Sequence, residues 1–177
     1  MASKADGPPP AQQTFLRTLL ADRFKLAIHK ETREMPIFTL VTARAEGRLD
    51  RQLNRSDFDC AAYLAGPHPP PEPGQTPQCG ARINLGLLSA KAITMSRLAA
   101  SLAPLVSRSV VDKAALTGSF DIELTWTPEP ATLDAAPNPP GTSIFAALQE
   151  QLGLRLATGR GPVDVWIVDH LLEPSEN

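Results

Sequence analysis

The two ends of this 177-residue chain resemble each other, and this likeness constrains the fold more than any other feature. The first copy, residues 15–41, reads FLRTLLADRFKLAIHKETREMPIFTLV, and the second, residues 144–168, reads IFAALQEQLGLRLATGRGPVDVWIV. Three apolar positions of the first copy, at Phe24, Leu26 and Ile28, align with Leu152, Leu154 and Leu156 of the second. A short helix followed by strands has one apolar face that it does not bury alone, so two copies predict a duplicated α+β module.

The two copies also predict the same local structure. The first has a helix over residues 12–26, for which Thr14 is a plausible N-cap, and strands over 26–28 and 36–41. The charged stretch 29–34 is interpreted as the turn of a hairpin. In the second copy, Ser143 caps a helix over 144–152 and Gly153 ends it. Strands over 154–157 and 163–168 follow, with 158–162 as their turn.

The middle of the chain predicts a further set of alternating elements. A strand over 87–93 precedes a helix capped by Thr94 or Ser96, which Pro104 ends or bends. A strand over 109–112 follows. Residues 119–126 alternate cleanly between apolar and polar side chains, which is typical of a half-buried strand.

Eighteen prolines cluster at the start of the chain and in two long segments, and they indicate linkers and loops. We therefore expect an α+β fold of duplicated αββ and βαββ modules, with mixed, mostly antiparallel sheets and helices packed on one face. The expected organisation runs along the chain as follows: a leader (1–13), the first αββ repeat (14–43), a Pro-rich insertion (44–82), a βαββ segment (83–127), a Pro-rich linker (128–142), the second αββ repeat (143–172) and a tail (173–177).

The only two cysteines, Cys60 and Cys79, bracket the Pro-rich part of the insertion. A bond between them would close that loop, whereas two unrelated thiols are the alternative. We expect the disulfide, which would place the protein in an oxidising compartment, periplasmic or extracellular.

Charge and hydropathy exclude several classes of partner. The net charge of −2 argues against a nucleic-acid binder, which normally carries a basic excess. No apolar run approaches the roughly 20 residues that span a bilayer. The first ten residues, MASKADGPPP, lack the apolar core of a signal peptide, so we expect that a signal or anchor is missing from this sequence.

Catalytic motifs are absent from the sequence, and neither a metal nor a cofactor is expected. The three histidines have no HExxH or CxxC partner, and no GxSxG or phosphate-binding loop occurs. If the chain is an enzyme, the candidate residues are His29, His170, Asp112 and Asp169. Asp112 is also typical of a turn residue that accepts backbone hydrogen bonds, and Asp169 and His170 of a polar strand end.

Several segments together resemble a family of uncharacterised secreted proteins from soil acidobacteria, which also occur fused behind BlaR-type sensor peptidases. These segments are LLADRFKLAIHKETREMPIFTLV, the cysteine pair, SVVDKAALTGSFDIELTWTPE, SIFAALQEQLGLRL and VDVWIVDHLLEPSEN. The resemblance implies secretion and carries no activity. Residues 93–168 are similar in pattern to the short N-terminal domains of secretins and TonB-dependent transducers, which are periplasmic interaction modules.

Three hypotheses of function follow. The first is a secreted or periplasmic module without catalysis, which binds another protein or a cell-envelope component by strand-edge contact. The second is a small ester or lactone hydrolase with a dispersed site. The third is a sensor domain that binds a small ligand in a pocket between the two repeats.

Overall fold

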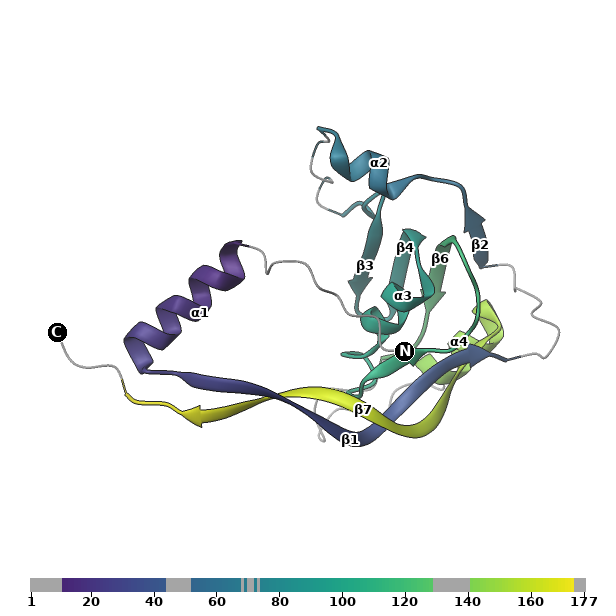
Figure 1. The fold of residues 1–177 in the computed structure, drawn as a ribbon. Helices are drawn as coiled ribbons and strands as arrows, with labels where there is room; N and C mark the ends of the chain where they lie inside the picture. The colour runs from purple at the N-terminus through teal and green to yellow at the C-terminus, as the bar shows by residue number, and fades with distance from the viewer. Residues whose placement is uncertain are drawn as a thin grey trace. The chain divides into compact units, whose positions relative to one another are not determined.

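A computed structural model describes residues 11–43, 52–67, 69, 72, 74–128 and 141–173. Four helices and seven strands are described (Figure 1), in the order α1 (Ala11–Phe24), β1 (Ala27–Thr42), β2 (Leu53–Ser56), α2 (Cys60–Ala65), β3 (Gly80–Asn84), β4 (Leu87–Ile93), α3 (Met95–Leu102), β5 (Val110–Asp112), β6 (Ser119–Thr125), α4 (Ile144–Leu152) and β7 (Leu154–His170). Most of the predicted leader, most of the predicted linker 128–142, the end of the tail and His68 lie outside the described residues.

The strands form two sheets. One has three strands in the order β5-β1-β7, and the other has four in the order β2-β6-β4-β3. Neighbours in the second sheet are antiparallel, while β1 and β5 are parallel. The prediction of an α+β fold with mostly antiparallel sheets is therefore confirmed.

The chain divides into two compact units. Unit 1 comprises residues 1–35 and 162–177, and unit 2 comprises residues 36–161. Strands β1 and β7 each run from one unit into the other. Each predicted αββ repeat is in fact one helix followed by one long strand, α1 with β1 and α4 with β7. Their origin by duplication stays a prediction.

Unit 2 holds the hydrophobic core. Phe120, Ile122 and Leu124 alternate along β6 and are buried, as the pattern of the sequence predicts. The apolar faces of α3 and α4 pack into the same cluster. Their fully buried side chains include Leu98, Leu102, Leu148 and Leu152. Each described residue of the buried core lies between Ile37 and Leu154, so unit 2 supplies its own core.

The helix boundaries of unit 2 follow from local capping. The Thr94 hydroxyl accepts the Arg97 N–H at 3.3 Å, and the Ser143 hydroxyl accepts the Ala146 N–H at 3.3 Å. Gly153 adopts the left-handed conformation after α4, with φ of 67°. These predicted caps are confirmed. The predicted cap Thr14 is wrong, because α1 begins at Ala11 and contains Thr14.

The two predicted hairpins are wrong, because β1 and β7 are continuous strands that lie side by side (Figure 1). Residues 29–34 contain no Gly, Pro, Asn or Asp, so the chemistry of a turn is missing. Their polarity reflects exposure along a strand rather than a turn. The side chains of Thr32 and Thr39 bond to Asp164 and Ala157, respectively. As β1 runs from Thr32 to Thr39, the residue bonded in β7 moves back from Asp164 to Ala157. The two strands are therefore antiparallel.

The second predicted turn, residues 158–162, is part of strand β7 and contains Gly159 and Gly161. A Cβ on Gly161 would lie 2.7 Å from Cδ1 of Ile37, which is buried. The glycine therefore permits a close approach inside the sheet and does not mark a turn.

The predicted Pro-rich insertion contributes more to the fold than expected. Within it, β2 pairs with β6, with Leu53 opposite Ile122, and Leu53 is only 2% exposed. The Cys60–Cys79 disulfide is confirmed, with its Cα atoms 5.6 Å apart. It joins the start of α2 to the residue before β3.

Unit 1 leaves apolar side chains exposed. Phe15 is 70% exposed on α1, and Leu16 and Leu19 beside it are also exposed. The Arg17 guanidinium lies 4.6 Å from the centre of the Trp166 ring, and Trp166 is 52% exposed. Trp166 therefore lies outside the hydrophobic core, whereas Trp126 packs against the core of unit 2. In the described part of the chain, no helix has the length and apolar character that crossing a membrane requires.

Candidate functional site

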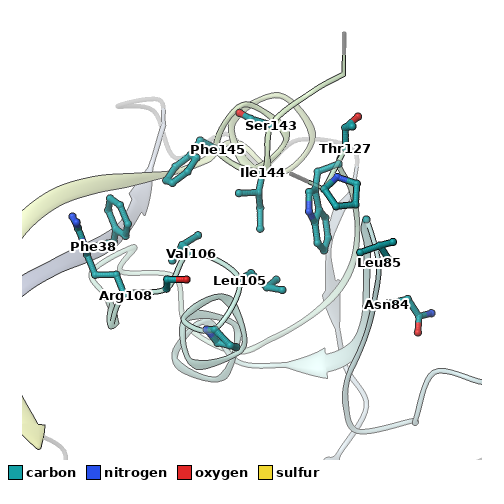
Figure 2. Close-up of a pocket in the computed structure, with 15 residues that line it drawn as sticks. Phe38, Asn84, Leu85, Leu105, Val106, Arg108, Thr127, Ser143, Ile144 and Phe145 are labelled. Atoms are coloured by element: carbon teal, nitrogen blue, oxygen red, sulfur yellow. The ribbon is translucent and has the colours of Figure 1, made fainter. Parts of the chain in front are cut away.

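A pocket of about 790 Å³ opens within unit 2 (Figure 2). Five segments line it: Phe38 of β1, the turn at 84–86, residues 104–108 after α3, residues 126–128 after β6, and residues 143–145 at the start of α4. The volume falls in the range of small-molecule sites, which is about 300 to 1,000 Å³.

The walls of the pocket are mainly apolar. Figure 2 shows Leu105 and Val106 facing Ile144 across the pocket, with Leu85 on another side. The rings of Phe38 and Phe145 meet edge to face, with centroids 5.5 Å apart and an interplanar angle of 64°. Such walls suit an apolar body more than a polar one.

Arg108 is the one charged residue among the fifteen that line the pocket. Its guanidinium carbon lies 4.7 Å from the centre of the Phe38 ring, within the range of a cation–π contact. Two backbone bonds hold this pair. The Phe38 N–H donates to the Ser109 carbonyl at 2.9 Å, and the Arg108 N–H donates to the Ala103 carbonyl at 3.2 Å.

Backbone hydrogen bonds also fix the part of the pocket rim formed by residues 84–86 and 126–128. Gly86 has φ of 75° in the turn between β3 and β4, and its carbonyl accepts the Trp126 N–H at 2.9 Å. The Thr127 N–H then donates to the Thr142 carbonyl at 2.9 Å. These bonds hold the chain that follows β6 against both the turn and the approach to α4.

A family model with the description "Protein of unknown function (DUF3738)" matches residues 1–171. The chain belongs to the DUF3738 family. No curated protein and no solved structure matches it. The family description carries no activity.

The structure brings together two of the four candidate catalytic residues. Nδ1 of His29 lies 2.8 Å from both carboxylate oxygens of Asp169, across β1 and β7 in unit 1 of the DUF3738 chain. The side chains are 53% and 45% exposed. Neither residue lines the pocket, and no described contact joins the pair to a serine. The pair has the geometry of a surface ion pair.

The other two candidates have separate surroundings. Asp112 accepts the Ala114 N–H at 3.0 Å and the Ser96 hydroxyl at 3.2 Å, which is the role of a turn residue. His170 is exposed at the end of β7, and its side chain has no hydrogen-bond partner among the described residues. The described residues also contain no group of three or more His, Cys, Asp or Glu that could hold a metal ion.

A cluster of charges marks the exposed ribbon of unit 1. Hydrogen bonds from Lys30 and, second, from Thr32 hold the pKa of Asp164 below its ordinary value of 3.8. A hydrogen bond from Arg33 likewise lowers the pKa of Glu31. These contacts stabilise the charged carboxylates at neutral pH, and those of Lys30 and Thr32 with Asp164 link β1 to β7.

The third hypothesis expected a pocket between the two repeats of this DUF3738 chain, but sequence reasoning did not identify the residues that line it. Phe38, Arg108 and Phe145 come from three segments that are distant in sequence, and no motif joins them. Phe38 and Phe145 are apolar residues within predicted elements, and such a position by itself indicates core packing.

Proposed function

We propose that this DUF3738 chain is a binding module without catalysis, which acts outside the cytoplasm. In this proposal, another protein or a cell-envelope component adds a strand to the edge of β7. The observation that carries the proposal is the free edge of a long strand.

Strand β7 spans Leu154–His170 and lies at the edge of its sheet, with β1 as its one neighbour among the described strands. An unpaired edge presents backbone N–H and C=O groups that another chain can pair with. Proteins that recognise extended peptides use such edges, and side chains on alternate residues provide specificity.

The part of β7 in unit 1 combines this edge with exposed apolar side chains. Trp166 and Val168 alternate along the strand, and both are more than half exposed. Exposed apolar residues on an edge strand favour pairing with a further strand, since natural sheets usually protect their edges with charges or proline. Pro162 lies at one end of this stretch, so we place the contact at residues 163–170.

The proposed location is supported by the disulfide. A bond between Cys60 and Cys79 forms and persists in oxidising compartments and is rare in the cytosol of mesophiles. It is therefore compatible with a periplasmic or extracellular site of action.

The edge proposal is tested by selecting peptides from a displayed random library on the intact, oxidised chain. We expect selected peptides with alternating apolar residues, and new protection of backbone amides at residues 163–170 in hydrogen exchange. Val168→Lys should weaken binding about tenfold or more, because an edge lysine opposes strand addition.

Phe58→Lys is the matched control, because Phe58 is an exposed apolar residue outside β7. It should leave peptide binding unchanged. Protection that appears only outside β7, or equal binding by the Val168→Lys variant, would contradict the proposal.

A second candidate function is the binding of a small ligand. The pocket favours it, because its walls include Phe38 from the first predicted repeat and residues 143–145 from the second. Both proposals describe a binding module, and they use different surfaces. The hydrolase alternative has no comparable support, since the His29–Asp169 pair lies on an exposed ribbon without a described nucleophile.

A further inference from the structure

We infer that the pocket of unit 2 binds a small amphipathic carboxylate, with an apolar body between the walls and the acid group at Arg108. This inference rests on the second candidate function, ligand binding in the pocket, and names the class of ligand. It does not depend on the edge of β7.

The charge of the pocket selects an anion. None of the fifteen lining residues is an aspartate or a glutamate, and Arg108 supplies a full positive charge. In the described part of the chain, the Arg108 guanidinium has no carboxylate partner. An anion that enters the pocket therefore meets a cation, and no negative side chain among the described lining residues opposes it.

The contact with Phe38 positions the guanidinium without using its donors. An aromatic face attracts the cation through its quadrupole, and it offers no acceptor to the N–H groups in the guanidinium plane. Those groups form a planar fork that matches the two oxygens of a carboxylate. Arg108 is exposed, so we expect this interaction to weaken as salt screens it.

The other walls require that the remainder of the ligand be apolar. Leu105, Val106 and Ile144 face the interior (Figure 2), and Trp126 is also part of the lining. A highly charged or sugar-like molecule would lose hydration against these apolar side chains, and few of its polar groups would find a partner among the polar lining residues, Asn84, Ser107, Thr127 and Ser143. A carboxylate with an aromatic or short aliphatic body satisfies both the cation and the apolar walls.

The test uses two probes of the same shape, 4-phenylbutyrate and its neutral isostere 4-phenylbutanamide. Trp126 reports on the pocket when the second tryptophan is removed by Trp166→Phe, since the chain has two tryptophans. In this background, we expect both probes to change Trp126 fluorescence and the acid to bind about tenfold more tightly than the amide.

Arg108→Gln should abolish the preference for the acid while leaving the binding of the amide unchanged. Arg55→Gln is the matched control, because Arg55 also lies over a phenylalanine, 5.6 Å from the centre of the Phe120 ring, and is outside the pocket. It should retain the full preference. Circular dichroism melts of both variants check that each remains folded.

The outcomes separate the inference from the function on which it rests. Equal binding of acid and amide, or a preference that survives Arg108→Gln, would overturn the inference and leave the pocket as a site for neutral apolar ligands. Absence of binding by both probes at millimolar concentration would overturn the inference together with the ligand-binding candidate. In either case, the edge proposal for β7 would be unaffected.

Discussion

At the scale of single residues, Gly86 holds a position that no other residue type fills easily. Its φ of 75° is left-handed, and an added Cβ would lie 2.6 Å from the backbone oxygen of Trp126. We expect Gly86→Ala to lower the free energy of unfolding by about 1 to 3 kcal/mol, measured by urea denaturation. Gly159→Ala is the control, because nothing lies within 4 Å of its added Cβ, and it should change stability by less than about 0.5 kcal/mol. Equal effects of the two variants would contradict this account.

Asp164 gives unit 1 a defined dependence on pH. Its pKa is lowered in the folded chain, chiefly by the hydrogen bond from Lys30, so the unfolded chain binds the proton more tightly. The stabilising contribution is therefore present above the ordinary pKa of 3.8 and is lost as pH falls through the lowered folded value. We expect amide exchange in β1 and β7 of unit 1 to accelerate below pH 4, once corrected for intrinsic rates. In Asp164→Asn this extra acceleration should be smaller, and an unchanged profile would exclude Asp164 as its source.

At the scale of elements, the disulfide closes the loop between α2 and β3. Cys60 and Cys79 are 19 residues apart, and loop-closure entropy predicts a contribution of about 3 kcal/mol for a loop of this size. The double variant Cys60→Ala, Cys79→Ala should lose about that much unfolding free energy in denaturant titration. Adding reductant should destabilise the original chain and leave the variant unchanged. A variant as stable as the oxidised chain would show that the bond does not constrain the unfolded state.

The elements that sequence reasoning predicted correctly are those specified by local chemistry. Thr94, Ser143 and Gly153 cap helices through contacts within a few residues, and the alternation along β6 follows from burial of one face. The two hairpin predictions were wrong because the structure there depends on a strand that is distant in the sequence. Residues 29–34 are strand because β7 pairs with them, although their charges had indicated a turn.

The candidate sites were predicted less well than the elements, for the same reason. The distance between His29 and Asp169 depends on the pairing of β1 with β7, and the pocket depends on five segments that the core brings together. The disulfide was predictable because two cysteines leave a single pairing, and the Pro-rich loop between them favours closure.

At the scale of the whole molecule, stability should be unevenly divided. The described residues of unit 1 include none that is buried, whereas β4, β6, α3 and α4 of unit 2 surround a closed core. Amides with little buried surface around them open at low cost. We expect hydrogen exchange followed by mass spectrometry to show faster exchange at residues 11–35 and 162–173 than in β4 and β6. Equal protection in both units would contradict this division.

The division of unit 1 between the two ends of the sequence sets an order for its formation during translation. Helix α1 and the first part of β1 leave the ribosome before all of unit 2, and their partners in β7 leave after it. At 5 to 20 residues per second, this interval is on the order of ten seconds. Throughout this interval Arg17 of α1 lacks its partner Trp166 of β7. The apolar side chains of α1 are thus the first of the described residues to be accessible outside the ribosome and the last to receive their partner strand.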